Sequence, residues 1–169
     1  TGGRQKREAV VKEIKQVKEE WLGRWMPRLT SQEAPINPYR VVWDLMHAVD
    51  RAHTIVTHDS GNPRDQMVPF YVTTAPRGYI GWGNTTQLGY SLGVSIGAKL
   101  AAPEKTVVHV MGDAAIGMAG MDFETAVRAG APILTIVLNN GVMGGYSGRM
   151  PTATERFRSN ILGGEYAQM

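Results

Sequence analysis

The first part of the chain repeats apolar positions at the spacing of a helix. Between residues 5 and 26 apolar side chains recur three or four positions apart, which gives a helix one apolar stripe. The opposite face mixes Lys, Arg and Glu, and Glu8 stands four residues before Lys12, the favourable order for an ion pair. This pattern predicts an amphipathic helix that ends at Pro27 and packs on its own protein, with a partner protein or a membrane surface as the alternative. The apolar stripe consists of Val10, Val11, Ile14, Val17, Trp21, Leu22 and Trp25.

A polar segment separates this helix from the rest of the chain. Residues 30–37 contain Pro35 and few apolar side chains, which predicts a linker. Asn37 and Pro38 then form a typical helix start, an N-cap residue followed by proline in the first turn. The apolar residues that follow predict a helix reaching Val49.

The middle of the chain gives weaker patterns. Residues 54–57 are mostly β-branched and predict a short strand that stops at His58. Residues 64–86 follow no clear period and give no prediction. A helix is expected over residues 87–101, where glycines four positions apart predict close packing of its backbone against a neighbouring element.

The last third of the chain has the clearest pattern. Residues 106–111 and 133–138 are continuous apolar runs, which are typical of parallel strands covered on both faces. Residues 121–129, which lie between these runs, predict a helix with Gly130 at its C-terminal cap. The expected fold is therefore α/β, a doubly wound parallel sheet with helices on both faces, preceded by the amphipathic helix and its linker.

Composition excludes several classes of function. The 169 residues are 43% hydrophobic and 20% charged, as expected for one globular domain with an attached segment. Without cysteine the chain has no disulfide, thiolate metal ligand or cysteine nucleophile. The net charge of +3 comes from Lys and Arg spread along the chain, which disfavours nucleic-acid binding. No apolar run has the length of a membrane span, so a cytoplasmic protein is predicted.

Polar residues follow both apolar runs, at the position where ligands bind to an open parallel sheet. Asp113 comes just after the first run and Asn140 just after the second, and the crossover between them should bring both to one edge. A carboxylate and an amide oxygen suit Mg²⁺ when phosphate oxygens complete its coordination shell. Residues 114–117 are small and should let an anion approach their backbone N–H groups ahead of the helix. The residues themselves therefore predict a Mg²⁺–diphosphate site.

The same residues resemble a known family. Gly112-Asp113-Ala114, two dozen further residues and Asn139-Asn140 resemble the thiamine diphosphate motif, in which glycine is commonest at the place of Ala114. The stretch GMAGMDFETAVRAGAPILTIVLNNG is similar to the pyrophosphate-binding domain of acetolactate synthases, oxalyl-CoA decarboxylases and 2-hydroxyacyl-CoA lyases. The likeness extends from about residue 35 to residue 146.

The resemblance implies a division of the chain. Residues 1–36 would be a leading helix and interdomain linker, and residues 37–169 a thiamine diphosphate-binding domain truncated at its C-terminal end. The pyrimidine-binding and middle domains of the family are expected to be absent from this chain.

The resemblance also implies roles for particular residues. Mg²⁺ would take the side chains of Asp113 and Asn140 and the backbone carbonyl of Val142, together with diphosphate oxygens and a water. Leu88 would be the apolar wedge that holds the cofactor in its bent conformation, and the carbonyl of Thr86 would accept from the aminopyrimidine amino group. The other expected cofactor contacts are Gly61, Asn62, Gly112, Ala114 and Ala115.

The implied activity makes or breaks a C–C bond next to a carbonyl, on a 2-oxo acid or a 2-hydroxyacyl-CoA. The family's relay glutamate lies in a pyrimidine-binding domain of the same or a neighbouring subunit. This chain would therefore supply half of an active site in a homodimer or homotetramer. One alternative is a non-catalytic half-subunit that holds the cofactor for a partner. The other is a Mg²⁺-dependent phosphohydrolase, although Asp59-Ser60-Gly61 lacks the second aspartate of such a site.

A few further residues are interpreted from their positions. His58 stands at a strand end and is an alternative site residue, and Glu124 is expected to be structural or solvated. Residues 143–149 are glycine-rich and form either a mobile substrate loop or an ordinary connection. Arg149 and Arg156 are candidates to meet an acidic substrate or a CoA phosphate. The histidines expected at the surface or in the packing are His47, His53 and His109.

Overall fold

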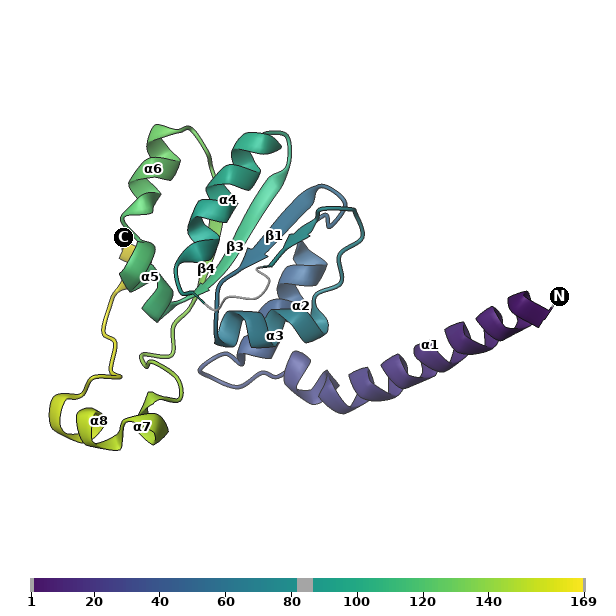
Figure 1. Ribbon diagram of the computed structural model, residues 1–169, viewed down its shortest axis with the longest axis horizontal. Helices are drawn as coiled ribbons and strands as arrows, with labels where there is room; N and C mark the ends of the chain where they lie inside the picture. Colours follow the sequence, from purple (N-terminus) through teal and green to yellow (C-terminus); the bar gives the residue numbers. More distant parts are fainter. Residues whose placement is uncertain (1, 82–86, 169) are drawn as a thin grey trace. The chain divides into compact units, whose positions relative to one another are not determined.

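In the part of the chain that the structure describes, four parallel strands form one sheet (Figure 1). The computed structural model describes residues 2–81 and 87–168. The chain divides into two compact units, Thr1–Asp44 and Leu45–Met169, and the sheet lies in the second. The predicted α/β fold with a parallel sheet is confirmed. In the order β2-β1-β3-β4, the strands are β1 (Thr54–His58), β2 (Tyr79–Ile80), β3 (Thr106–Gly112) and β4 (Leu134–Leu138).

The registers align the carboxyl ends of the strands. β1 pairs with β3 from Thr54 opposite Thr106 to His58 opposite Val110. In the pairing of β3 with β4, Gly112 stands opposite Leu138. The residues that follow β3 and β4 therefore leave the sheet at the same level.

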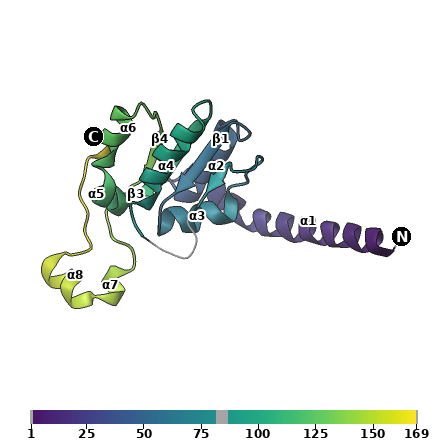
Figure 2. The same ribbon diagram turned by 45° about the horizontal axis from the view of Figure 1, so that its top comes forward.

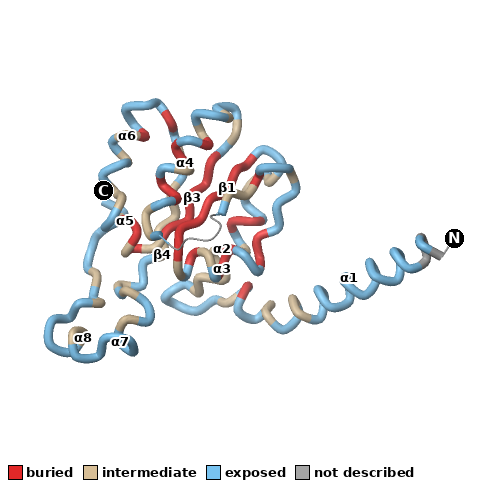
Figure 3. Tube along the Cα trace, in the orientation of Figure 1, coloured by how far each residue is buried: buried red, intermediate tan, exposed pale blue. Residues whose placement is uncertain are grey.

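The centre of the second unit lies around β3, where buried residues gather (Figure 3). Successive residues of a strand point to opposite faces, and residues of both faces of β3 are buried. Helix α4 (Tyr90–Ala101) contacts β1 and β3 on one face, and α6 (Asp122–Arg128) lies beside it (Figure 1). Helices α3 (Asn62–Phe70) and α5 (Asp113–Ala119) begin beyond the carboxyl ends of β1 and β3.

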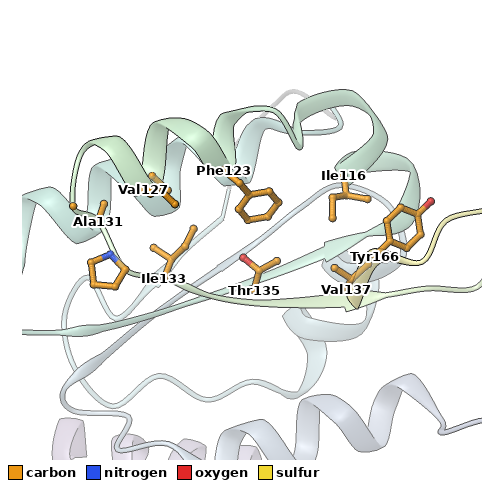
Figure 4. Close-up of a pocket in the computed structure, with 11 residues that line it drawn as sticks. Ile116, Phe123, Val127, Ala131, Ile133, Thr135, Val137 and Tyr166 are labelled. Atoms are coloured by element: carbon orange, nitrogen blue, oxygen red, sulfur yellow. The ribbon is translucent and has the colours of Figure 1, made fainter. Parts of the chain in front are cut away.

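Strand β4 is less buried than its apolar sequence predicts. In the described part of the chain it is the edge strand of the sheet, and Leu134 is 55% exposed. Between β4 and α6 lies an apolar cavity of about 570 Å³, into which Phe123, Ile133 and Tyr166 project (Figure 4). The prediction of a strand covered on both faces is wrong for β4, because Leu134 is exposed and the other residues of the strand are only partly buried, with the cavity open on the side of α6.

The first unit begins with a helix that is longer than predicted. Helix α1 (Gly2–Leu29) continues past Pro27, since the fixed φ of proline suits a helix and the N–H of Thr30 still reaches the carbonyl of Met26 at 3.0 Å. Trp25 packs against Tyr39, with their ring centroids 5.0 Å apart.

The apolar stripe of α1 is covered only toward the C-terminal end of the helix. Trp21, Leu22 and Trp25 are partly buried. No described residue covers the N-terminal part of the stripe, and its packing on its own protein stays a prediction. The exposed residues are Val10 (46%), Val11 (57%), Ile14 (61%) and Val17 (60%).

Helix α2 (Pro38–Ala48) begins as predicted, because Asn37 caps it. The Oδ1 atom of Asn37 accepts a hydrogen bond from the N–H of Tyr39 at 3.0 Å. The helix ends at Ala48, one residue before Val49. The predicted linker before it has no regular secondary structure over residues 31–37.

Helix α4 starts three residues later than predicted, at Tyr90. Gly89 precedes it in the left-handed conformation, with φ of 87°, and therefore ends the loop. The helix buries the face that carries Leu92 and Ile96. Gly93 and Gly97 lie on its exposed face, and a Cβ atom at either would meet nothing within 4 Å. The predicted close packing of these two glycines is wrong.

The crossover between β3 and β4 contains two helices where one was predicted. Residues 114–117 belong to α5, which begins at Asp113, so they do not stand ahead of the helix. Helix α6 follows after Gly120. Gly130 lies just past the end of α6 with φ of 62°, as its predicted cap role requires.

A small helical lobe follows β4. Residues 143–160, here called the α7–α8 lobe, contain α7 (Tyr146–Arg149) and α8 (Pro151–Phe157). An antiparallel bridge between Val142 and Ile161 closes its base, and the lobe extends away from the sheet (Figures 1 and 2). The 3-10 helix η1 (Tyr166–Gln168) lies beyond it. None of the described helices is both long enough and apolar enough to cross a membrane.

Candidate functional site

A cavity of about 540 Å³ opens at the carboxyl ends of β1, β3 and β4. The loop after β1 forms one wall, and Leu88 and the first residues of α5 form another. The turn after β4 and the first helix of the α7–α8 lobe complete it. The cavity therefore lies at the position predicted for a ligand from the polar strand ends.

Asp113 connects the end of β3 to the turn after β4. It is the first residue of α5 and is only 4% exposed. Its Oδ1 accepts from the N–H of Ala114 at 2.9 Å, and its Oδ2 accepts from the N–H of Gly141 at 2.7 Å. The carboxylate is thus fixed in the cavity wall by backbone groups from both strand ends.

The turn after β4 is held by its own amide side chains. The Oδ1 of Asn139 accepts from the N–H of Gly141 at 3.2 Å, and the Oδ1 of Asn140 accepts from the N–H of Val142 at 3.1 Å. Gly141 has φ of 70°, a conformation that favours glycine. The structure brings Asn140 and Val142 to the same cavity as Asp113.

These side chains fit a metal only with outside oxygens. The described residues contain no group of three His, Cys, Asp or Glu side chains that could hold an ion. One carboxylate, one amide and backbone carbonyl oxygens are hard ligands of low charge, which suits Mg²⁺ bound together with phosphate and water.

The loop after β1 approaches the cavity with bare backbone. Gly61 has φ of 74°, and a Cβ atom there would meet nothing within 4 Å. It lines the cavity with Asn62, the first residue of α3. On the rim Arg64 pairs with Asp65, with Nη2 and Oδ1 2.7 Å apart. A polar ligand can therefore come close to the main chain here.

Leu88 lies in the wall that includes the first residues of α5. It is partly buried, lines the cavity and packs against Met111, Ala115 and Ile116. Ala115 itself is fully buried in that cluster, so its side chain lies beneath the cavity. Thr86 lies outside the described residues.

Two further predicted cofactor contacts lie at the cavity. Gly112 and Ala114 line it beside Asp113. A Cβ atom added at Gly112 would meet only Pro63 Cγ, at 3.9 Å, so the wall is open at this point.

The histidines lie away from the cavity. His58 is 2% exposed and its Nδ1 lies 3.1 Å from the carbonyl oxygen of Asp59, with its ring centroid 5.3 Å from that of Tyr79. Burial lowers its pKa. The reading of His58 as a site residue is therefore wrong, because the strand turns its ring toward β2. His47 and His53 are exposed, as predicted.

His109 is buried in the packing, as predicted, and it also makes hydrogen bonds to partners that the sequence analysis does not predict. Its Nε2 lies 2.6 Å from the hydroxyl of Ser91, which donates to the carboxylate of Asp59 at 2.5 Å. A polar side chain within an apolar strand run was the signal that could have pointed to this network.

The α7–α8 lobe supplies cavity residues that the motif did not include. Met143 and Tyr146 line the cavity, and so does Arg149. Arg156 is not one of the described residues that line the cavity. Residues 143–149, predicted as either a mobile substrate loop or an ordinary connection, therefore reach the site, and Arg149 brings positive charge to it. Glu124 pairs with Arg128 on the exposed side of α6 at 2.9 Å, in line with a solvated residue.

Comparisons with known proteins match most of the chain to one family. Residues 59–163 match the family described as "Thiamine pyrophosphate enzyme, C-terminal TPP binding domain". A probable acetolactate synthase large subunit of Methanocaldococcus jannaschii is 29% identical over 139 residues, which cover 75% of this chain and 24% of that protein. A 2-hydroxyacyl-CoA lyase of Arabidopsis thaliana is 32% identical over 127 residues, which cover 73% and 22%.

A bacterial relative gives the same picture. The acetolactate synthase isozyme 3 large subunit of Escherichia coli is 30% identical over 126 residues, which cover 75% of this chain and 22% of that protein. The chain thus spans less than a quarter of the length of these relatives.

Proposed function

The chain belongs to the thiamine pyrophosphate enzymes as a C-terminal TPP-binding domain, and on that premise we propose that its cavity holds the magnesium diphosphate end of thiamine diphosphate. Domains of this family bind thiamine diphosphate with Mg²⁺. The observation that carries the proposal is the convergence of Asp113 and Asn140, from two successive strand ends, on one cavity.

Mg²⁺ binds the side chains of Asp113 and Asn140 and the backbone carbonyl of Val142 in this proposal. Each carboxylate oxygen of Asp113 accepts one backbone N–H and keeps a lone pair that can face a metal. The hydrogen bond between Asn140 Oδ1 and the N–H of Val142 holds the second and third ligands in one turn. The diphosphate supplies further oxygens.

Backbone groups hold the diphosphate. Gly61, Asn62, Gly112 and Ala114 line the cavity, and the bare backbone at Gly61 leaves room for phosphate oxygens. Ala115 is fully buried and does not line the cavity, so its expected contact with the cofactor stays a prediction. Arg149, which lines the same cavity, offsets part of the negative charge of the ligand, whereas the charge of Arg64 is paired with Asp65. A role for Arg149 toward an acidic substrate or a CoA phosphate remains a prediction.

Leu88 acts as the apolar wedge beneath the bent cofactor. Its side chain lines the cavity, and the packing against Met111 and Ile116 prevents it from moving away. The contact expected from the carbonyl of Thr86 stays a prediction. The bound cofactor supplies an electron sink for cleavage or formation of a C–C bond next to a carbonyl.

The whole protein is proposed to act on a 2-oxo acid, by decarboxylation or carboligation, or to cleave a 2-hydroxyacyl-CoA. The names of the acetolactate synthase and 2-hydroxyacyl-CoA lyase relatives support this range. Residues 1–36 would be the leading helix and linker, and residues 37–169 the cofactor domain. A pyrimidine-binding domain of the same or a neighbouring subunit, in a cytoplasmic homodimer or homotetramer, would complete the site.

A non-catalytic cofactor-holding half-subunit is the second candidate. One observation favours it, since no glutamate occurs among the described residues that line the cavity. The phosphohydrolase alternative loses its nucleophile, because the Asp59 carboxylate is fully buried and occupied by hydrogen bonds.

Calorimetric titration of thiamine diphosphate into the chain tests the proposal. Binding is expected with Mg²⁺ present and is expected to disappear when EDTA removes the metal. Titration of the chain joined to a pyrimidine-binding domain should give tighter binding. An absence of binding with Mg²⁺ in both proteins would overturn the proposed site.

A further inference from the structure

A network of buried polar side chains lies behind the cavity wall and touches none of the residues proposed to bind the metal. It joins β1, α4 and β3, and its members are almost fully shielded from solvent. Buried polar groups are costly unless hydrogen-bonded, so such a network needs a structural or functional reason. Its members are Thr57, Asp59, Ser91, Ser95 and His109.

The carboxylate of Asp59 is the centre of this network and is 0% exposed. Its Oδ1 accepts from the N–H groups of Ser60 at 2.8 Å and Gly89 at 3.1 Å. Its Oδ2 accepts from Gly89 N–H at 3.1 Å, from Ser91 N–H at 3.3 Å and from the Ser91 hydroxyl at 2.5 Å. One carboxylate thus ties the loop after β1 to the start of α4.

The two segments tied by Asp59 are both parts of the cavity wall. Ser60 precedes Gly61 in the wall proposed to meet the diphosphate, and Gly89 directly follows Leu88 in the other wall. Asp59 is itself anchored, because its N–H donates to the carbonyl of Val110 on β3 at 2.8 Å. One side chain, whose own residue is bonded to the central strand of the sheet, therefore joins both segments.

The protons of the network follow from charge. A carboxylate can only accept, so the Ser91 hydroxyl donates to Asp59, and the Nε2–H of His109 must donate to Ser91 Oγ. The Nδ1 of His109 then faces the hydroxyl of Thr135 at 3.4 Å as an acceptor. Burial lowers the pKa of His109 to about 4, so the ring is neutral at neutral pH. A neutral ring in one tautomer holds the serine hydroxyl toward the carboxylate.

We propose that Asp59 is a positioning residue of the cofactor site, holding Leu88 and the Ser60–Gly61 backbone at a fixed separation, with Ser91 and His109 holding its carboxylate. This role deepens the proposed function and rests on it. The cluster is not a hydrolase triad, because the serine hydroxyl lies between carboxylate and imidazole and is 1% exposed.

Amide hydrogen exchange, followed by NMR in the cofactor-free chain, tests the hold on both walls. Asp59→Asn keeps the shape but replaces one acceptor oxygen with a donor. In Asp59→Asn the amide of Gly89, which bonds to both carboxylate oxygens, is expected to exchange at least about tenfold faster, the change that follows from the loss of one hydrogen bond. In Asp59→Ala, which removes both acceptor oxygens, the amide of Ser60 is expected to exchange faster by the same factor. Unchanged exchange at either amide would overturn the proposal.

Thr57→Val is the matched control. It removes a buried hydrogen bond of the same network, between the hydroxyls of Thr57 and Ser95, that does not reach Gly89. It should lower the melting temperature and leave the exchange of Ser60 and Gly89 unchanged. Equal acceleration in both variants would show general loosening and would contradict a positioning role.

Cofactor binding provides the second readout. Asp59→Asn is expected to weaken binding of magnesium thiamine diphosphate by about tenfold or more. Leu88→Ala should then add little further loss, because the wedge is already displaced. Additive losses would overturn the positioning of Leu88 by Asp59.

Two further comparisons keep the proposal falsifiable. If Asp59→Asn does not fold, Ser91→Ala removes only the hydroxyl and should give the same pattern with smaller changes, and an unchanged pattern would contradict the proposal. If the parent chain binds no cofactor, the proposed function fails, whereas hydrogen exchange still decides whether Asp59 holds both walls.

Discussion

Asp113 has two tasks at the residue scale. It is proposed to bind Mg²⁺, and it also accepts the N–H groups of Ala114 and Gly141. Because Asp113 lies just past its strand, the loss of its side chain would be expected to leave the fold intact. The structure revises this expectation, because the loss of the carboxylate removes the acceptor of the Ala114 N–H and the shorter of the two hydrogen bonds made by the Gly141 N–H.

We predict that Asp113→Ala abolishes Mg²⁺-dependent binding of thiamine diphosphate and lowers the free energy of unfolding by about 1–3 kcal/mol. Calorimetry measures the binding, and urea titration measures the stability. Asp122→Ala removes an exposed carboxylate of α6 and should change neither. Binding by Asp113→Ala that still depends on Mg²⁺ as in the parent would refute the metal assignment.

Leu88→Ala is predicted to separate binding from catalysis. The magnesium and diphosphate contacts stay, so cofactor affinity should fall only partly. The bent conformation loses its support, so turnover in the protein with its pyrimidine-binding domain should fall by more than the affinity does. A parallel loss of both, or no loss of turnover, would argue against the wedge role.

His109 predicts a pH dependence of stability. Its pKa is about 4 in the folded chain, against 6.5 ordinarily, because burial opposes its charge despite the nearby Asp59. Between these values the unfolded chain binds more protons. The free energy of unfolding should therefore fall as pH drops from 6.5 toward 4, by up to about 1.4 kcal/mol per pH unit.

Urea titrations at about pH 7, 6 and 5 measure this change of the free energy of unfolding with pH. His109→Gln should flatten it, whereas His47→Gln, which changes an exposed histidine, should not. His58 has its pKa lowered by burial as well, so part of the slope should remain in His109→Gln. An equal slope in the parent and in His109→Gln would contradict the assignment.

The sequence alone can predict those site residues that directly follow a strand. Asp113 and Asn140 follow apolar runs, and parallel strands bring such ends together regardless of side-chain detail. Asp59 could not be found in this way. Its role depends on Ser91, which lies 32 positions away and reaches it only after α4 packs on β1.

At the scale of elements, glycines of α4 have opposite roles on the same helix. Gly89 has φ of 87° at the start, and a Cβ atom there would lie 2.7 Å from that of Ala119. Gly93 lies on the exposed face with nothing within 4 Å of its Cβ position. The first needs glycine and the second does not.

We therefore predict changes of opposite sign. Gly89→Ala should destabilise the chain by more than about 1 kcal/mol, since it adds a clash to a left-handed conformation. Gly93→Ala should stabilise it by about 0.5–1 kcal/mol, through the helix propensity of alanine. Urea midpoints of the two variants decide, and shifts of the same sign would contradict the packing described for α4.

The predictability of the elements depends on whether their signals are local. Asn37-Pro38 predicts the start of α2. The same dipeptide, Asn62-Pro63, begins α3, a helix that the sequence analysis does not predict. The apolar period that supports α2 is missing from α3, which carries a second proline at Pro69. The edge position of β4 could not be predicted, because strand order depends on long-range pairing.

At the scale of the whole molecule, the described chain leaves apolar surface uncovered in two places. One is the edge strand β4 with the cavity beside it, and the other is the exposed stripe of α1. An edge strand offers unpaired backbone groups to another chain. The chain on its own is therefore predicted to self-associate as its concentration rises.

Sedimentation velocity over a range of concentrations measures this association. Leu134→Lys places a charge on the exposed side of β4 and should shift association to about tenfold higher concentration or more. Ile14→Lys makes the matching change on α1 and should have less effect. A larger effect of Ile14→Lys would show that α1, and not the strand edge, is the associating surface.

The closed base of the α7–α8 lobe makes that segment exchangeable. Val142 and Ile161 pair, and the N–H of Leu162 donates to the carbonyl of Gly141 at 2.9 Å, so the segment leaves and re-enters the fold at one point. Doubling the length of a segment whose ends are held together costs only about 0.6 kcal/mol of closure entropy. Lobes of different length and sequence can therefore be grafted between these residues. The substrate specificity would then change with the lobe, while the proposed metal ligands stay the same.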